Sequence, residues 1–173
     1  MQLRLERWAS PISTLLLVTD EVDVLRALYF GDRVEPLHRV LQQHYGQYML
    51  SEGPAADTIK APLEAYFAGS LNAIEAIPVA TGGTAFQREV WRVLRTIPAG
   101  TTTTYGHLAS MLGREGASRA VGAANGANPV AIVVPCHRVV GADGTLTGYG
   151  GGLAHKRWLL AHEARHSPVL VGA

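Results

Sequence analysis

The chain has 173 residues, of which 47% are hydrophobic and 17% charged, and its formal net charge is +1. This length fits one large domain or two small ones, and no apolar run approaches the roughly 18 residues that a membrane-spanning helix needs. The single cysteine, Cys136, excludes an internal disulfide framework and a cysteine-rich zinc site. No secretory signal is evident, so we expect a reducing, cytoplasmic location.

Charge divides the chain near residue 80. Residues 1–80 hold six basic and ten acidic residues, whereas residues 81–173 hold nine basic and four acidic ones. The glycines follow the same division, since fifteen of the 19 lie after residue 80. A basic second half favours an anionic partner such as a nucleic acid, although a basic face can also be merely solvated.

Residues 1–80 predict a small sheet with two helices. Alternating apolar residues begin at Leu3, and residues 14–18 and 25–30 predict strands around the acidic turn at 20–23. From Pro36 the apolar residues follow a helical period that stops at Gly46. A second helix is predicted from Asp57 to Gly69, and residues 70–83 are expected to form a linker.

Three helices are predicted next. Thr84 and Gln87 have capping-box spacing and open a helix that ends at Pro98. This helix carries a stripe of arginines (Arg88, Arg92 and Arg95) that either meets an anion or is solvated. A short helix capped by Thr104 and a second helix over 117–125 are joined by a glycine-containing turn, which is typical of a helix-turn-helix.

The second helix of that pair is made almost entirely of small residues, and Arg119 is its only charge. Such a helix either packs very close to another helix or enters a groove. Gly122 lowers helix stability relative to alanine, so we expect it to mark a close approach.

Cys136 follows an apolar run over 130–134 that predicts a strand buried on both faces. A lone cysteine is commonly a small buried hydrophobe, but polar residues follow this one at once. His137 beside it could lower the pKa of the thiol. On the last predicted helix, Lys156 and Glu163 share one face, so Glu163 is either solvated or paired with His137 in a relay to Cys136.

Two other motifs do not support a function. Residues 162–166 match the H-E-x-x-H pattern of zinc proteases, but no third ligand follows them. The glycine-rich segment 148–152 lacks the spacing of a dinucleotide fingerprint and the lysine of a P-loop. We therefore expect no metal, and we interpret the glycine-rich segment as a loop that lines a site.

The motif Pro135-Cys136-His137-Arg138, with Asn128 upstream and Glu163 downstream, resembles that of O6-alkylguanine-DNA alkyltransferases, particularly the bacterial constitutive form. The resemblance is dense over residues 81–166 and weaker over residues 1–80. It implies a small N-terminal ribonuclease-H-like α/β domain at 1–80. It also implies a mostly helical C-terminal domain at 81–173 with a winged-helix-like helix-turn-helix and the reactive cysteine.

The resemblance also implies roles for individual residues. Catalytic roles would fall on Cys136 as alkyl acceptor, His137, Glu163, Tyr105, Asn128 and Lys156. DNA contacts would fall on Ala117, Ser118, Arg119, Ala120, Gly122, Ala123 and Arg138, with Arg119 filling the space left by a flipped nucleotide. Val139, Tyr149 and Gly150 would line the substrate pocket.

The implied function is DNA repair, in which an alkyl group moves irreversibly from O6-alkylguanine in double-stranded DNA to Cys136. O4-alkylthymine is a further candidate substrate. The expected protein acts once per molecule, uses no cofactor or zinc, binds no membrane, and is a monomer that could assemble cooperatively on DNA. Two other classes stay open: a cysteine hydrolase, and a damage sensor that binds without transfer.

Overall fold

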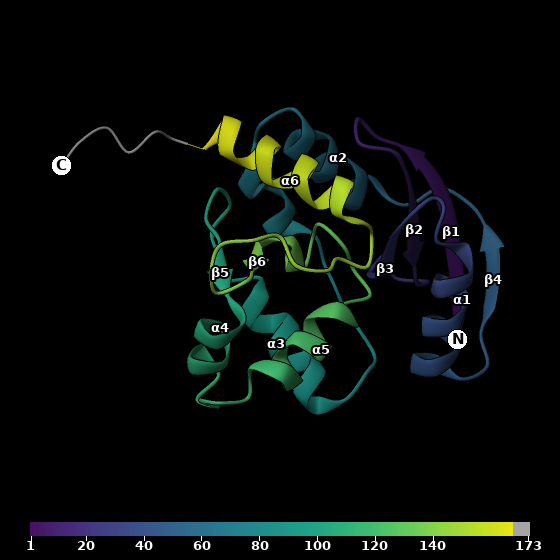
Figure 1. Ribbon diagram of the computed structural model, residues 1–173. Coiled ribbons are helices and arrows are strands. Elements are labelled where there is room, and N and C mark those ends of the chain that lie inside the picture. Colours follow the sequence, from purple (N-terminus) through teal and green to yellow (C-terminus); the bar gives the residue numbers. More distant parts are fainter. Residues whose placement is uncertain (168–173) are drawn as a thin grey trace.

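A computed structural model describes residues 1–167 of the chain (Figure 1). The first half contains the elements β1 (Gln2–Ala9), β2 (Thr14–Thr19), β3 (Leu25–Phe30), α1 (Val34–Tyr45), β4 (Met49–Glu52) and α2 (Asp57–Phe67). The second contains η1 (Leu71–Ala76), α3 (Ala85–Leu94), β5 (Thr103–Thr104), α4 (Tyr105–Met111), α5 (Ser118–Gly126), η2 (Cys136–Arg138), β6 (Val139–Val140) and α6 (Leu153–His166). The mixed α/β class is therefore confirmed, with the larger sheet in the first half and most helices in the second.

The larger sheet has the strand order β3-β2-β1-β4. Strands β1, β2 and β3 pair antiparallel, and the strands predicted on either side of the turn at 20–23 are confirmed as β2 and β3. β4 pairs parallel with β1, bringing Leu50 opposite Leu3, and it was not predicted because its four residues are mostly exposed and carry no alternation. Helix α1 supplies the crossover that a parallel pair requires.

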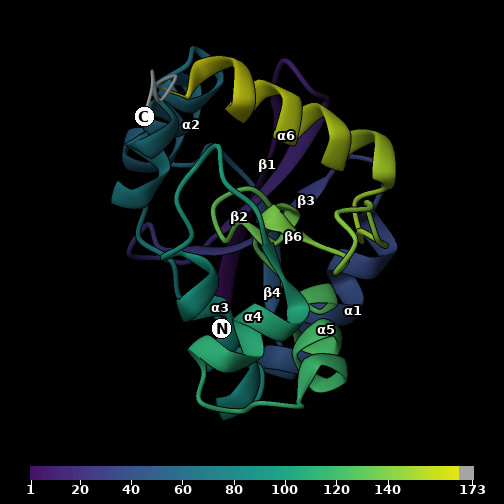
Figure 2. The ribbon, with the colours of Figure 1, turned by 60° about the vertical axis from the view of Figure 1, so that its left-hand side comes forward.

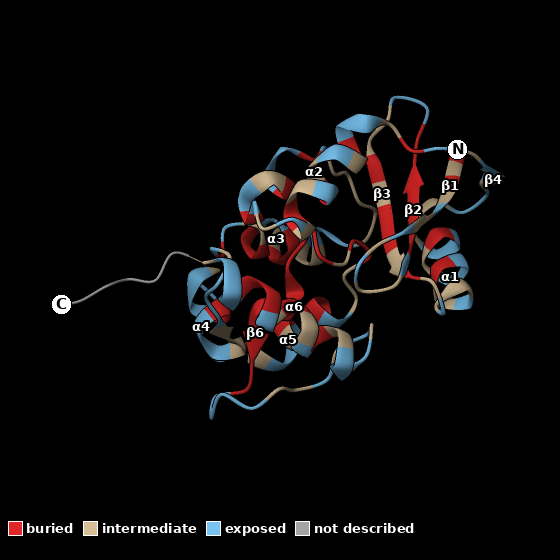
Figure 3. Ribbon diagram, turned by 90° about the horizontal axis from the view of Figure 1, so that it is seen from above, coloured by how far each residue is buried: buried red, intermediate tan, exposed pale blue. Residues whose placement is uncertain are grey.

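Helix α1 covers one face of this sheet, where Leu37 and Leu41 pack with Leu3, Leu5 and Leu16. The other face joins a larger apolar cluster that contains residues from both halves of the chain. Figure 3 shows that buried residues dominate β2 and β3. The larger cluster thus crosses the predicted domain boundary at residue 80. Residues 168–173 of the second predicted domain lie outside the described residues.

The expected linker is partly an ordered element. Residues 71–76 form the 3-10 helix η1, and Leu71, Ile74 and Ile77 are buried. Their spacing of three residues matches the three residues per turn of a 3-10 helix. The side chain of Arg95 donates hydrogen bonds to the carbonyls of Ile74 and Ile77, so one member of the predicted basic stripe supports this turn.

The predicted strand over 130–134 is wrong. These residues are buried, but they form turns, with only an isolated bridge between Val130 and Leu28 of β3. A continuous apolar run indicates burial and does not by itself choose the backbone conformation. Ile132 adopts a left-handed φ of 71°, which is rare for a β-branched residue.

The predicted helices are confirmed. The capping box at the start of α3 is complete, and the Thr104 side chain accepts a hydrogen bond from the backbone of His107 at the start of α4. α4 and α5 follow each other across a short turn, consistent with the expected helix-turn-helix. Figure 2 shows α3, α4 and α5 together in the lower part of the view, with α6 across the top. None of the helices described over residues 1–167 is long and apolar enough to cross a membrane.

Candidate functional site

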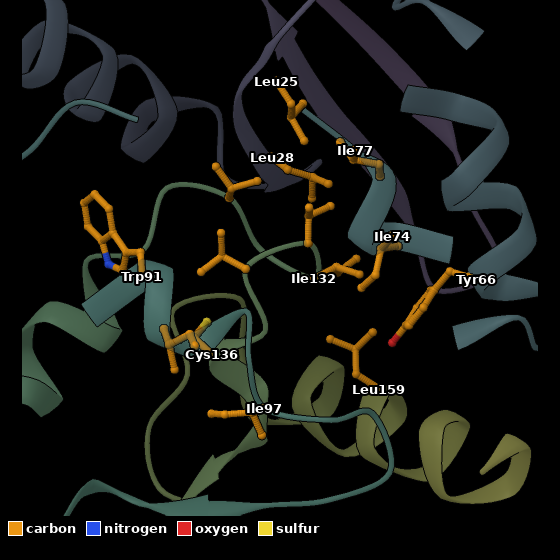
Figure 4. Close-up of a cluster of buried hydrophobic side chains, with 14 of the residues drawn as sticks. Leu25, Leu28, Tyr66, Ile74, Ile77, Trp91, Ile97, Ile132, Cys136 and Leu159 are labelled. Atoms are coloured by element: carbon orange, nitrogen blue, oxygen red, sulfur yellow. The ribbon is translucent and has the colours of Figure 1, made fainter. Parts of the chain in front are cut away.

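Cys136 lies on the wall of a cavity of about 180 Å³ that both halves of the chain line. It begins the single turn η2 and is 7% exposed. Figure 4 shows its side chain at the apolar cluster that also contains Ile97 and Ile132. The cavity is also lined by Tyr29, Phe30, Arg33, Asn128, Tyr149 and Gly150. The cysteine is therefore a buried group with access to a space that could hold a small ligand.

Glu163 of α6 is fully buried, and its carboxylate accepts hydrogen bonds from three side chains. His137 Nε2 lies 2.8 Å from Oε2, and the Tyr66 hydroxyl donates to the same oxygen at 2.8 Å. Arg138 donates from Nε to Oε1 at 2.8 Å and from Nη2 to Oε2 at 2.9 Å. Burial tends to raise the pKa of Glu163, but His137 and Arg138 outweigh it and hold the pKa well below its usual range. Glu163 is therefore an anion at neutral pH.

The hydrogen bond to Glu163 determines which ring nitrogen of His137 can accept a proton. An ionised carboxylate only accepts hydrogen bonds, so the proton of a neutral His137 ring is on Nε2 and the lone pair is on Nδ1. Nδ1 is buried and has no hydrogen-bond partner among residues 1–167. The predicted pair of Glu163 and His137 is thus present, and Nδ1 is the atom able to receive a proton.

Arg138 does not lie where a DNA contact would need it. It is only 4% exposed, and besides Glu163 its guanidinium donates to the carbonyl of Ile97 at 2.6 Å. The expectation of a DNA contact at Arg138 is therefore corrected. A buried carboxylate needs a compensating charge, and Arg138 supplies it.

The thiol of Cys136 is surrounded by groups that act in opposite directions on its acidity. Burial raises its pKa, and the side chains of Asn128, Lys156 and Tyr149 lower it, with the net result above the usual value. Burial in turn lowers the pKa of Lys156. The Lys156 ammonium donates to the carbonyls of Val139 at 2.7 Å and Thr147 at 3.2 Å, so it also anchors the loop that faces the cysteine.

Asn128 organises the turn that precedes Cys136. Its side-chain oxygen accepts from the backbone N–H of Val130 at 2.9 Å, and its amide donates to the carbonyl of Val134 at 2.8 Å. These bonds replace those that a strand would have provided. Asn128, expected among the catalytic residues, thus holds the turn that leads to Cys136.

The other side of the cavity is formed by the loop between β6 and α6. The hydroxyl of Tyr105 lies 2.8 Å from Oγ1 of Thr147, and Tyr149 packs edge-on against Phe30 with 6.2 Å between ring centroids. Gly150 lines the cavity as predicted. Val139, predicted in the pocket wall, does not line the cavity: its side chain is fully buried in the apolar cluster.

Similar sequences assign the chain to a known protein family. The family described as 6-O-methylguanine DNA methyltransferase, DNA binding domain, matches residues 85–165. A methylated-DNA--protein-cysteine methyltransferase of Shigella flexneri is 50% identical over 160 residues, covering 91% of this chain and 94% of that protein. The chain belongs to the methylated-DNA--protein-cysteine methyltransferase family.

Solved structures of this methyltransferase family agree over nearly the whole fold. The O6-methylguanine methyltransferase of Mycobacterium tuberculosis has a TM-score of 0.79 at 41% identity, covering 97% of this chain and 95% of that one. The Mycobacterium tuberculosis protein solved in complex with DNA has a TM-score of 0.78 at 40% identity, covering 98% and 96%. The resemblance in sequence and the mixed α/β fold class are thereby confirmed.

In this methyltransferase-family protein, α5 presents a surface of small side chains. Arg119, Ala120 and Ala123 are exposed, and Ala117, Ser118 and Gly122 are partly exposed. An added Cβ at Gly122 would lie 3.6 Å from the ring of Tyr105, an ordinary contact. The expected close approach is therefore not imposed by packing within the described residues.

Sequence reasoning did not assign roles to several residues at the site. Tyr66 of the first half was given no role from the sequence, yet its hydroxyl donates a hydrogen bond to Glu163. A tyrosine on an apolar helix face usually needs a partner for its hydroxyl, which is the signal that could have found it. Tyr29 and Arg33 carried no such signal, because only tertiary folding brings them to the cavity. Among residues 1–167, no cluster of three or more His, Cys, Asp or Glu side chains could hold a metal ion.

Proposed function

We propose that this protein repairs double-stranded DNA by moving an alkyl group from O6 of guanine to Cys136, once per molecule. The observation that carries the proposal is Cys136 on the cavity wall beside the buried pair of His137 and Glu163. The family membership supports it, because the relatives are named for transfer to a protein cysteine.

The chemistry follows from the proton positions. His137 Nδ1 accepts the thiol proton, directly or through water, and Glu163 stabilises the resulting imidazolium. The thiolate then attacks the alkyl carbon in line with the C–O6 bond. A sulfur–carbon bond forms, the electrons of the C–O6 bond pass to the base, and the base takes up one proton to become guanine.

In the proposed reaction two further side chains assist the transfer. The Tyr105 hydroxyl at the cavity loop can donate a hydrogen bond as negative charge moves into the ring, and such a donor lowers the transition-state energy. The Lys156 ammonium adds positive charge near the sulfur while holding the loop through Val139 and Thr147. No metal or cofactor is needed for this displacement.

The product limits the protein to one reaction. A thioether on Cys136 has no good leaving group for water to displace, so the thiol is not regenerated. The damaged base must also leave the duplex, because a stacked base cannot reach a buried cysteine. We assign α5 to the DNA surface and Arg119 to the space that the flipped nucleotide leaves.

The proposed partner is duplex DNA containing O6-alkylguanine, with O4-alkylthymine as a further candidate. The proposed setting is the cytoplasm, where a protein with one cysteine stays reduced. We expect a monomer, and cooperative assembly on DNA is part of the same proposal. The division into domains at residues 1–80 and 81–173 also stands as a proposal.

The test is the stoichiometry of transfer, followed by intact mass. With excess DNA containing O6-methylguanine, each molecule should remove at most one methyl group and gain its mass on Cys136. Cys136→Ser should bind the DNA and transfer nothing, since a serine hydroxyl is far less ionised at neutral pH. Repeated turnover would instead indicate a hydrolase, and binding without a mass change would indicate a damage sensor.

A further inference from the structure

The hydroxyl of Tyr149 is buried beside the cavity and has no hydrogen-bond partner among residues 1–167. Unpartnered buried polar groups are rare in folded proteins, and each one calls for an explanation. Tyr149 and Cys136 line the same cavity. This hydroxyl therefore shares the cavity with the reactive cysteine and has no described partner of its own.

The loop that carries Tyr149 is held at several points. Thr147, two residues earlier, accepts a hydrogen bond at its carbonyl from Lys156 at 3.2 Å, and its side chain lies 2.8 Å from the Tyr105 hydroxyl. Phe30 of β3 packs against the Tyr149 ring. A Cβ added to Gly151 would lie 2.3 Å from the Phe30 ring and 2.7 Å from the Tyr149 ring. The glycine thus permits the contact that fixes Tyr149.

Three side chains around Cys136 favour its thiolate, and they differ in what else they bind. The Asn128 amide already donates to the carbonyls of Val134 and Val130. The Lys156 ammonium already donates to two backbone carbonyls. The Tyr149 hydroxyl donates to no other group within residues 1–167, so its proton is available to the sulfur.

Two other titratable side chains lie near Cys136. Tyr29 of β3 lines the same cavity, and burial raises its pKa to about 12. His137 directs its Nε2 proton to Glu163 and acts as the base. Burial, with the nearby Cys136, raises the pKa of Tyr149 well above its usual value of 10, so this phenol keeps its proton as the thiol ionises.

We propose that Tyr149 is a catalytic residue whose hydroxyl donates a hydrogen bond to the Cys136 sulfur as the thiolate forms. Its assignment as a catalytic group rests on the proposed alkyl transfer, whereas its effect on the thiol does not. The thiol proton passes to His137, the Tyr149 proton stays on oxygen, and the hydrogen bond stabilises the anion until the sulfur–carbon bond forms. Hydrogen bonds to charged groups are among the stronger ones in proteins.

The experiment measures how fast iodoacetamide alkylates Cys136 in the full chain between pH 6 and 10, read by intact mass. Iodoacetamide needs no guanine recognition, so it reports on the thiol alone. Tyr149→Phe keeps the ring and should raise the thiol titration midpoint by about one unit, which is about tenfold in rate at pH 7. The rate at high pH, where the thiol is fully ionised, should stay unchanged.

Tyr48→Phe is the matched control, because Tyr48 bonds to His38 and packs with the cluster under α1 on the other face of the sheet. It should titrate like the wild type. An unshifted titration in Tyr149→Phe would overturn the proposal, and so would an equal shift in Tyr48→Phe. If Tyr149→Phe slows only the reaction with free O6-benzylguanine, the hydroxyl serves the base and the proposal is wrong. Failure of DNA repair itself would leave the iodoacetamide result standing.

Discussion

Glu163 contributes both to the proposed chemistry and to the stability of this protein. Its carboxylate pairs with His137, which follows the reactive cysteine in the chain, and with Arg138, which is buried with it. Tyr66 adds a donor from the first half of the chain. A carboxylate used only to orient a histidine would need one donor. The others maintain its charge in an apolar core, because an unpaired buried anion is strongly unfavourable.

Glu163→Gln should therefore destabilise the fold by about 3–5 kcal/mol, because it leaves the Arg138 guanidinium buried without a counter-charge. Chemical denaturation at pH 7 measures this loss directly. An unchanged free energy of unfolding would show that Arg138 finds another partner. Arg114→Ala is a suitable comparison, since the pair it forms with Glu89 is exposed and should contribute little.

The same residue makes stability depend on pH. The pKa of Glu163 is lower in the folded protein than in the unfolded chain, where it is about 4.3. The stabilisation is therefore complete above about pH 5 and is lost as the pH falls toward the depressed folded value. Denaturation series from pH 7 to pH 3 should show wild type losing more stability than Glu163→Gln. Parallel curves for the two proteins would contradict the assignment.

At the scale of elements, α5 differs from the other helices in what it leaves exposed. Its inward side packs Val121 and Ala124 into the core, and the carbonyl of Ala124 accepts from the Trp91 indole of α3 at 2.8 Å. Its outer side offers alanines and one long cation, Arg119. Such a surface allows close approach to a duplex, and the guanidinium can reach farther than the helix.

Arg119→Ala should slow repair of O6-methylguanine in duplex DNA by roughly 10- to 150-fold, equivalent to about 1.4–3 kcal/mol. The reason is that extruding a nucleotide costs a few kcal/mol, part of which the inserted guanidinium offsets. Reaction with free O6-benzylguanine needs no extrusion and should stay near the wild-type rate. Equal losses on both substrates would place Arg119 in the fold or in thiol activation.

At the scale of the whole molecule, strand β3 joins the two halves. It is an edge strand of the larger sheet, and two later segments of the chain, one before and one after the division at residue 80, bond to it. Leu25 exchanges backbone hydrogen bonds with Pro78 and Ala80, and Leu28 with Pro129 and Ala131. These contacts cover an edge that would otherwise be open, and they bring β3 to the cavity of Cys136.

Leu28→Ala should lower the free energy of unfolding by about 2–5 kcal/mol, because Leu28 is buried in the shared cluster. We expect wild type and variant to unfold in one transition, with coincident changes in tryptophan fluorescence and circular dichroism. Two separate transitions would instead support independently folding domains divided near residue 80.

The sequence alone was sufficient to predict the elements that depend on residues close together in the chain. The capping box of Thr84 and Gln87, the helical period of α1 and the strands on either side of the turn at 20–23 were predicted from residues that are close together in the sequence. The motif around Cys136 was sufficient for the family. Helical spacing placed Lys156 and Glu163 on one face, whereas the choice between a solvated Glu163 and one paired with His137 was made by the structure.

Contacts between distant segments decided the rest. The apolar run over 130–134 is turned rather than extended, since Asn128 satisfies its backbone groups and β3 offers only an isolated bridge. Arg138 points inward because Glu163, 25 residues away, is its counter-ion. Tyr66 and Phe30 reach the site only through packing of the two halves. Partners so far apart along the chain leave no periodicity in the sequence, so only the folded protein brings them together.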